Sequence, residues 1–354
     1  MHILVTGHLG YVGPAVVVRL KEAGHRVTGL DIGYFRECVD ARLRATKPDA
    51  ELTLDIRDVA KRDLKQIDAI VHLSGLSNDP LGQMDPALTM TINHAATLRL
   101  AQLAKECSVG RFIFASSCSM YGASGDASRP LDENAPLRPE SAYAASKVAC
   151  ERDLATLADA DMAPVFLRFA TAFGVSPRMR FDLVLANLVG WARTTGVIKV
   201  LSDGTPWRPL VHVADMALAI HCALEAPVEI VRSRAFNIGR TDNNVRVRDI
   251  ADAVRRQVPG SRVDITGKTG GDPRSYRVDF TRALSDLPGF RPRWTIEMGA
   301  EEIDRWLVER KLDADQFQSR LYVRLKQLLH LQQSGSLDAD LRFRFPPVNP
   351  ADGR

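Results

Sequence analysis

The sequence of 354 residues has few of the features that mark secreted, membrane-spanning or nucleic-acid-binding proteins. Its five cysteines are odd in number, scattered and without CxxC or Cys/His spacing, so we expect no structural metal and free thiols in a reducing cytoplasm. No apolar run is long enough to span a membrane, and a first strand predicted at residues 2–5 leaves no room for a signal peptide. With a net charge of +4 and no Lys/Arg cluster, we expect no nucleic-acid partner.

Short apolar runs that are typical of buried strands alternate with helical stretches along the chain. Strands are predicted at residues 2–5, 26–30, 52–54, 69–73, 111–115 and 165–169, and helices at residues 15–23 and 87–107. This alternation predicts an α/β fold with a parallel sheet that is covered on both faces. Because ligands of such sheets bind beyond the carboxyl ends of the strands, we expect the functional site at that edge.

The first predicted strand runs into a glycine-rich turn, TGHLGYVG, in which Gly7, Gly10 and Gly13 recur every third residue. A helix follows, and the second strand ends in Asp31. Strand, glycine turn, helix, strand and terminal acid together are typical of a dinucleotide-binding unit. The glycines let the backbone approach a pyrophosphate. Asp31 would bind the ribose hydroxyls of the adenosine and repel a 2′-phosphate, so the cofactor is predicted to be NAD.

Tyr143 and Lys147 are four residues apart in an Ala-rich segment that is predicted to be helical. On a helix they share one face, with about 5–6 Å between their Cβ atoms. The free phenol has a pKa of about 10, and a nearby ammonium group is expected to lower it. The pair therefore predicts a general base made from a phenol. A surface tyrosine above a lysine is the alternative when this motif occurs alone.

The complete set of motifs resembles the extended short-chain dehydrogenase/reductases, specifically the NAD-dependent nucleotide-sugar epimerase/dehydratase family. The matching segments are TGHLGYVG, the GLD acid, HLSG, SSCSMYG, YAASK, RFATAFG, SDGTPWRPLVHVADMA and GGDPRSYRVD. The resemblance implies a Rossmann fold, a doubly wound parallel sheet with a smaller C-terminal α/β substrate lobe, and a cytoplasmic homodimer. The expected domains are residues 1–174 with 211–240 for NAD, residues 175–210 and 241–307 for the substrate, and residues 308–354 as a C-terminal helical extension and tail.

The resemblance also implies roles for individual residues. Tyr143 is expected to be the acid/base, Lys147 its partner and a ribose contact, and Ser117 the catalytic hydroxyl. The expected cofactor-binding residues, besides Tyr143 and Lys147, are Gly7, Gly10, Tyr11, Val12, Gly13, Asp31, Ile32, Asp55, Ile56, Leu73, Ser74, Gly75, Asn93, Ser116 and Phe169. A nucleotide-diphosphate sugar is expected to contact Asn78, Ser119, Thr171, Asn187, Val200, Arg208, Asp272 and Arg274.

The residues after Ser117 bear on the type of reaction. Dehydrating relatives carry an Asp-Glu pair there and decarboxylating relatives keep the Glu, whereas this chain has Cys118 and Ser119. We therefore predict an epimerase that inverts C4 through a transient 4-keto sugar. Three alternatives stay open: a keto-sugar reductase or dehydrogenase with the same groups, a C3 or C5 epimerase that uses Cys118, and a non-catalytic NAD-sensing or scaffold protein.

Two regions depart from the family pattern. The usual Asn after the sixth strand is Thr171, and the usual Arg-Pro-Gly-Asp is Thr-Gly-Gly-Asp at residues 269–272, so Arg274 or Lys268 must replace the missing charge. These changes leave the nucleotide base open. After residue 308 the resemblance fades. The leucines between residues 321 and 331 predict an amphipathic helix that packs either on its own lobe or on a second subunit.

Overall fold

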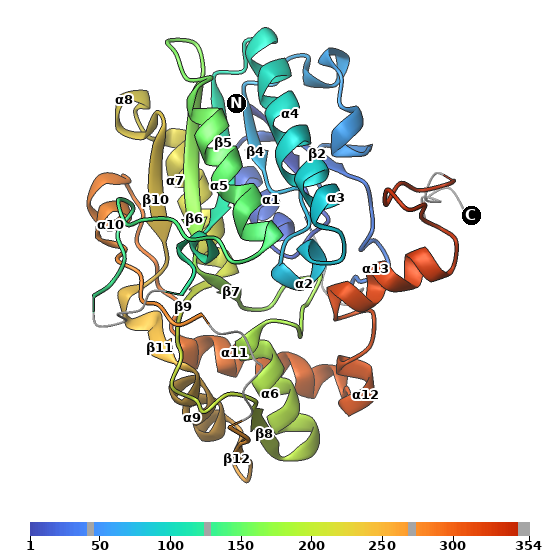
Figure 1. The fold of residues 1–354 in the computed structure, drawn as a ribbon, viewed down its shortest axis with the longest axis vertical. Coiled ribbons are helices and arrows are strands. Elements are labelled where there is room, and N and C mark those ends of the chain that lie inside the picture. Colours follow the sequence, from blue (N-terminus) through green and yellow to red (C-terminus); the bar gives the residue numbers. More distant parts are fainter. Residues whose placement is uncertain (41–45, 124–128, 268–273, 346–354) are drawn as a thin grey trace.

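The computed structural model describes residues 1–40, 46–123, 129–267 and 274–345 (Figure 1). Its largest element is a seven-stranded parallel sheet with the order β10-β6-β5-β4-β1-β2-β3. The strands are β1 (His2–Thr6), β2 (Arg26–Asp31), β3 (Ala50–Thr53), β4 (Ala69–His72), β5 (Arg111–Ser117), β6 (Ala163–Phe169) and β10 (Arg234–Ile238). This order confirms the predicted doubly wound Rossmann fold.

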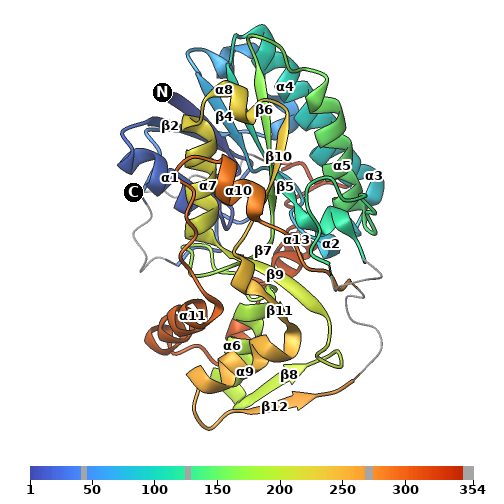
Figure 2. The same cartoon turned by 90° about the vertical axis from the view of Figure 1, so that its left-hand side faces the viewer.

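Helices cover both faces of the sheet, which is why its central strands are buried along their length and mainly apolar. Every residue of β4 and of β6 is buried. On one face α1 (Gly13–Glu22) packs beside α7 (Val213–Glu225), and on the other α4 (Ala96–Glu106) packs beside α5 (Ala142–Ala155) (Figures 1 and 2). A strand that is buried on both faces has no polar side, so its sequence shows no alternation.

The helix predicted over residues 87–107 is divided into three parts. It consists of α3 (Pro86–Met90), a π-helical turn (Thr91–Ala95) and α4. The carbonyl of Asn93 in the π turn accepts hydrogen bonds from Thr97 Oγ1 at 2.7 Å and Cys150 Sγ at 3.1 Å. These side chains compensate for the altered backbone bonding, and a hydrophobic period alone does not reveal such a turn.

A smaller α/β part lies below the carboxyl edge of the large sheet (Figure 1). It contains a three-stranded sheet of β7, β9 and β11 and a parallel pair of β8 and β12. Its elements are β7 (Thr171–Phe173), α6 (Val184–Thr195), β8 (Val197–Val200), β9 (Trp207–His212), β11 (Asn244–Arg246), α9 (Val247–Gln257), β12 (Arg262–Ile265) and α11 (Ile296–Arg310). The other short helices are α2 (Asp79–Gly82), α8 (Val228–Val231), α10 (Thr281–Asp286) and α12 (Ala314–Phe317).

The predicted C-terminal amphipathic helix is α13 (Arg324–Gln333). It packs on its own chain: Leu328 and Leu331 are buried in the hydrophobic cluster that contains Leu81 of α2. Leu321 and Leu329 remain exposed. The structure therefore shows contacts of this helix with the Rossmann part of its own chain. In the described ranges no helix combines the length and the apolar character needed to cross a bilayer.

A buried ion pair fixes α5 to the sheet. The guanidinium of Arg168 on β6 donates to both carboxylate oxygens of Glu151 on α5, with a shortest distance of 2.6 Å. Glu151 also accepts a hydrogen bond of 2.6 Å from Ser116 of β5, and Arg168 donates to the hydroxyl of Tyr121 at 3.0 Å. Because α5 carries Tyr143 and Lys147, this network sets their position relative to β5.

We expect Arg168→Met to lower the free energy of unfolding by about 3–5 kcal/mol, because it leaves the Glu151 carboxylate buried without its partner. Urea denaturation measures the loss. The double variant with Glu151→Gln is the control, and it should recover part of the stability because no charge is left unpaired. A single variant as stable as the parent protein would show that the pair does not anchor α5.

Candidate active site

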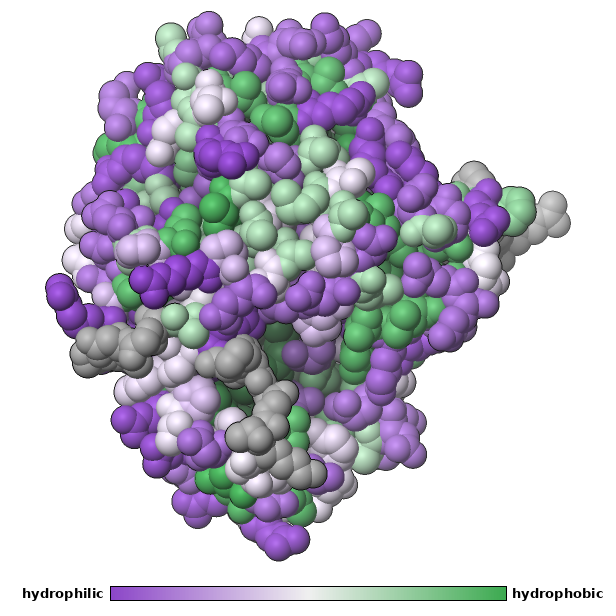
Figure 3. All heavy atoms as spheres, in the orientation of Figure 1, coloured by the Kyte–Doolittle hydropathy of each residue, from purple (hydrophilic) through white to green (hydrophobic). Residues whose placement is uncertain are grey.

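A cavity of about 890 Å³ lies between the carboxyl edge of the large sheet and the smaller α/β part (Figure 3). It is lined by most of the residues that sequence analysis assigned to the site. Those from the cofactor set are Gly7, Gly10, Tyr11, Val12, Gly13, Asp31, Ile32, Asp55, Ile56, Leu73, Ser74, Gly75, Ser116, Tyr143, Lys147 and Phe169. Those from the substrate and catalytic sets are Asn78, Ser117, Ser119, Thr171, Arg208 and Arg274.

The glycine turn after β1 has no room for a Cβ atom at Gly7 or Gly13. A Cβ on Gly7 would lie 2.9 Å from the carbonyl carbon of Leu73, and a Cβ on Gly13 would lie 2.5 Å from the Cα of His8. At Gly10 a Cβ would meet only the carbonyl oxygen of Gly7, at 3.1 Å, and would otherwise project into open space. The turn therefore leaves room for a ligand to approach its backbone, which fits the pyrophosphate of a dinucleotide.

Asp31 ends β2 and borders the same cavity. Its carboxylate accepts hydrogen bonds from the backbone N–H groups of Leu9 at 3.1 Å and Gly33 at 2.7 Å. These two bonds hold the acid beside the glycine turn. This is the place where a ribose with free hydroxyls is bound in a dinucleotide site, so the residues present fit NAD.

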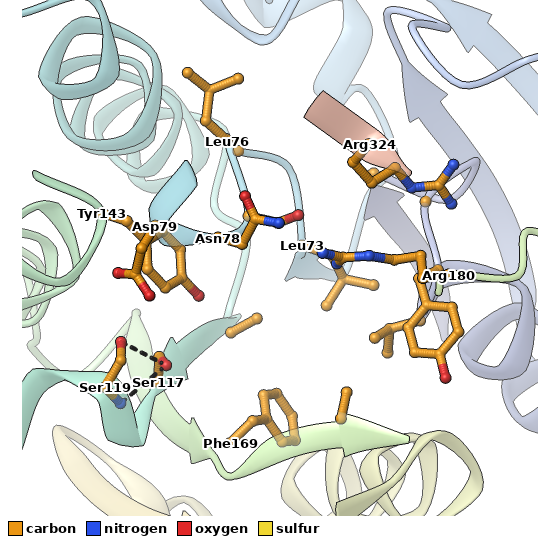
Figure 4. Close-up of a pocket in the computed structure, with 18 of the residues that line it drawn as sticks. Leu73, Leu76, Asn78, Asp79, Ser117, Ser119, Tyr143, Phe169, Arg180 and Arg324 are labelled. Carbon is orange, nitrogen blue, oxygen red and sulfur yellow. Dashed lines mark hydrogen bonds between the residues drawn. The ribbon is translucent and has the colours of Figure 1, made fainter. Parts of the chain in front are cut away.

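Ser117, Ser119 and Tyr143 lie together at the other end of the cavity (Figure 4). The Ser117 hydroxyl donates to Ser119 Oγ at 2.9 Å and accepts from the Ser119 backbone N–H at 3.1 Å. Lys147 Nζ donates to the carbonyl of Ala115 at 2.7 Å and lies 5.7 Å from the centroid of the Tyr143 ring. One turn of α5 thus places the phenol and the ammonium group beside the end of β5.

The acid–base properties differ from the sequence prediction. Burial raises the pKa of Tyr143 to about 12, and a hydrogen bond with Ser117 and the charge of Arg180 only partly oppose it. Burial also lowers the pKa of Lys147 to about 8. The expectation that Lys147 lowers the pKa of Tyr143 is therefore wrong for the protein without cofactor. The Lys147 ammonium donates to a backbone carbonyl, and loss of water favours the neutral form of both groups.

Polar contacts connect the two sides of the cavity near Tyr143. Asn78 donates to Asp182 at 3.1 Å, and Arg274 forms an ion pair with Asp79 at 2.8 Å. Arg208, whose side chain donates to the backbone carbonyl of Arg274, lies beside it. Two guanidinium groups from β9 and the segment after residue 273 therefore reach the same part of the cavity, where they can bind an anionic ligand.

Three predicted contacts do not reach the cavity wall. The amide of Asn93 is buried and bonded to both backbone groups of Leu76, because it closes the loop after β4. The amide of Asn187 donates to the carbonyl of Phe181 and so ends the turn before α6. Val200 is buried in the core of the smaller part. Asp272 and Lys268 lie outside the described residues.

Sequence reasoning missed several residues that line the cavity. They are Tyr34 and Phe35 after β2, Asp79 on α2, Arg180 and Asp182 before α6, and residues 323–325 at the start of α13. Arg180 donates to both carboxylate oxygens of Asp182 at 2.9 Å. None of these positions belongs to a family motif, and the periodic pattern over residues 321–331 indicates a helix without indicating that its first residues line a cavity. Their position on the cavity wall depends on how the Rossmann part, the segment before α6 and the start of α13 pack together.

A possible metal-ligand cluster lies away from this cavity, at the ends of α1 and α7. Atoms of His25, His221 and Glu225 that are able to bind a metal lie within 4.8 Å of one another. The Arg19 guanidinium, however, donates to His221 Nδ1 at 3.1 Å, and burial lowers the pKa of both histidines. A neighbouring fixed cation disfavours a metal ion, so we assign no site there.

Comparison with known proteins agrees with this geometry. The sequence pattern of the NAD dependent epimerase/dehydratase family matches residues 3–239. The chain belongs to this family. It is 27% identical to a UDP-glucose 4-epimerase of Lactobacillus helveticus over 312 residues, which cover 83% of this chain and 92% of that protein. Its identity to a UDP-glucose 4-epimerase of Bacillus subtilis is 26%, with 86% and 96% covered.

Solved structures show the same fold. MoeE5 in complex with UDP-glucose and NAD has a TM-score of 0.72 and 27% identity, and the match covers 88% of this chain and all of that one. An NAD-dependent NDP-hexosamine 5,6-dehydratase, TunA, has a TM-score of 0.76 at 22% identity and covers 89% of this chain and all of its own. Family membership and these neighbours identify the cofactor as NAD.

We expect Lys147→Met to stabilise the cofactor-free protein at pH 7 by about 1–3 kcal/mol, because it removes a buried charge. The folded pKa of about 8 lies below the ordinary 10.5. Between these pH values the unfolded chain binds more protons, so stability of the parent rises with pH and the gain from the substitution shrinks. Urea denaturation at pH 7, 8, 9 and 10 tests this.

Lys65→Met is the matched control, because Lys65 is exposed. Its effect on the free energy of unfolding should be small and independent of pH. A Lys147→Met protein that is less stable at pH 7, or whose gain is equal at every pH, would contradict the account of this buried ammonium group.

Proposed function

We propose that the protein is an NAD-dependent nucleotide-sugar epimerase that inverts C4 through a transient 4-keto sugar. The observation that carries the proposal is the meeting of Ser117, Tyr143 and Lys147 at one end of a cavity whose other end fits the dinucleotide. The similarity to UDP-glucose 4-epimerases over more than four fifths of the chain supports the same reaction type and favours a UDP-sugar.

Tyr143 is the general base in this proposal. It removes the proton of the C4 hydroxyl, and Ser117 donates a hydrogen bond to the carbonyl that develops at C4. Bound NAD supplies the hydride acceptor and a positive charge that favours the phenolate. Without that charge the pKa of Tyr143 is about 12. We therefore infer that the phenolate forms when the cofactor is bound.

The return step needs space for the keto sugar to turn over. In this proposal that space is the Tyr143 end of the cavity of about 890 Å³, whose other end is assigned to the dinucleotide. After the turn the reduced cofactor would return the hydride to the opposite face of C4, and Tyr143 gives the proton back to the oxygen. The sugar is inverted with no net change of redox state.

The nucleotide diphosphate is proposed to lie against the smaller α/β part, with residues 175–210 and 241–307 as the substrate lobe. Arg208 and Arg274 are its guanidinium contacts, since this side chain matches two phosphate oxygens by geometry and keeps its charge. Asn78 and Thr171 line the path between these arginines and Tyr143. Thr171 offers a hydroxyl in place of the amide of the usual family Asn.

The surroundings of Cys118 disfavour a C3 or C5 epimerase. Its side chain is fully buried, donates to the carbonyl of Arg168 at 3.1 Å and does not line the cavity. Burial raises the pKa of the thiol. A group with no access to the sugar and a raised pKa is a poor base at neutral pH.

We expect Tyr143→Phe to reduce kcat for C4 inversion by about 100- to 10,000-fold with little change in substrate affinity, because it removes the acid/base and leaves the ring in place. The measurement is a screen of UDP-, GDP- and dTDP-sugars by NMR, followed by kinetics on the best substrate. Full activity of the variant would overturn the mechanism. Stoichiometric consumption or release of NADH would show the alternative reductase or dehydrogenase.

Cys118→Ser tests the remaining assignment. A hydroxyl in this position can keep the hydrogen bond to the Arg168 carbonyl, so we expect at least about half of the parent C4 epimerase activity and no change in product. Both proteins are also assayed in deuterated water. If the parent introduces deuterium at C3 or C5 of the product and Cys118→Ser does not, Cys118 is identified as an acid or base.

A further inference from the structure

The first residue of α13 carries a buried cation to the wall of the cavity. Arg324 is 2% exposed and lines the cavity beside Val323 and Leu325. Its Nη2 donates to the backbone carbonyl of Arg178 at 2.9 Å, and the guanidinium lies 4.3 Å from the centroid of the Phe35 ring. Among the described residues, its Nη1 is buried and has no hydrogen-bond partner.

This side chain lacks the counter-charge that a buried cation needs. Cys38 and then Asp182 raise the pKa of Arg324, but both carboxylate oxygens of Asp182 already accept from Arg180. Burial and the positive charge of Arg180 lower the pKa of Arg324 to about 10. An unpaired buried charge is costly, so the arrangement is complete only when an anion lies beside Arg324.

The position of Arg324 points to the cofactor rather than to the sugar. Phe35, on which it stacks, follows Asp31 and lines the adenosine end of the cavity. Figure 4 shows Arg324 at the side of the cavity opposite Ser117 and Tyr143. A dinucleotide bound with its adenosine beside Asp31 would bring its diphosphate toward this end.

The C-terminal segment is held firmly enough to present this charge. Gln327 donates to the carbonyl of Tyr34 at 3.2 Å, and Arg320 forms an ion pair of 2.7 Å with Glu37. Farther along, the Tyr34 hydroxyl donates to the carbonyl of Leu341 at 2.5 Å. On the other side of the cavity, the backbone of Tyr322 accepts from the N–H of residue 181 at 3.0 Å. The segment therefore joins the loop after β2 to the smaller α/β part.

We propose that Arg324 binds a phosphate of the NAD diphosphate and that the C-terminal extension is part of the cofactor site. The inference rests on NAD as the cofactor and not on the reaction proposed above, so either can fail without the other. The extension thereby has a function that the hydrophobic pattern of α13 did not indicate: it closes the dinucleotide site from outside the Rossmann fold.

The test compares Arg324→Gln with Lys326→Gln, which removes an exposed charge two residues away on the same helix. Binding of NAD, ADP-ribose, NADP, UDP and adenosine to the cofactor-stripped full-length protein is measured by titration calorimetry. We expect Arg324→Gln to weaken NAD and ADP-ribose by about 10- to 100-fold, as for loss of a charge-assisted hydrogen bond. Adenosine and UDP should bind as to the parent, and Lys326→Gln should change nothing.

Thermal unfolding separates binding from a structural role. Because the substitution removes an unpaired buried charge, cofactor-free Arg324→Gln should unfold at the same temperature as the parent or higher, while the upward shift on adding NAD shrinks. If Gln prevents folding, Arg324→Lys keeps the charge and should retain most of the NAD affinity.

Several outcomes would overturn the proposal. Parent-like affinity for NAD in Arg324→Gln would do so, as would an equal loss for adenosine, which would indicate a collapsed site. A loss confined to UDP would assign the charge to the nucleotide sugar, and a loss confined to NADP would assign it to a 2′-phosphate.

Discussion

The site depends on the burial of an amine and a phenol side by side at the end of one strand. Lys147 and Tyr143 have no carboxylate bonded to them among the described residues, and loss of water favours the neutral form of each. Burying this pair lowers the free energy of unfolding, and in the proposed mechanism Tyr143 becomes a base only when the positive charge of the bound cofactor lies beside it. The protein therefore keeps its acid–base groups poised, at a cost in stability that the surrounding core must offset.

The fold provides that support through elements that are distant in sequence. The Arg168–Glu151 pair holds α5 against β5 and β6, directly behind the catalytic groups. Because the carboxyl ends of parallel strands lie at one edge of the sheet, the glycine turn, Asp31 and Ser117 meet there although they are distant in sequence. The smaller α/β part adds Arg208 and Arg274 from below, and the C-terminal segment adds Arg324 from the side. The cavity is thus formed by three segments, of which the third carries no family motif.

This division explains what the sequence could and could not predict. The glycine turn, Asp31, Ser117 and the Tyr143–Lys147 spacing are local patterns, and the structure brings all of them to the cavity. Asn93 and Asn187 were placed by resemblance, but their amides instead satisfy backbone groups of the loops around them. The predicted direction of the pKa shift of Tyr143 was wrong, because the spacing of residues predicts which groups are neighbours but not how far burial removes them from water. The amphipathic pattern around Arg324 predicts a helix but not its contact with the cavity, which depends on where α13 packs.

The path of the hydride at C4 is the most direct test of the central claim. A UDP-glucose that carries deuterium at C4 should give an inverted product that keeps the deuterium at C4 of the same molecule, with none in bulk water and no free NADH. This result is expected because, in the proposed mechanism, the bound cofactor would carry the hydride from C4 and return it to the opposite face of the same sugar. Inverted product that has lost its deuterium to solvent, or product in which the label has moved to another sugar molecule, would contradict the account.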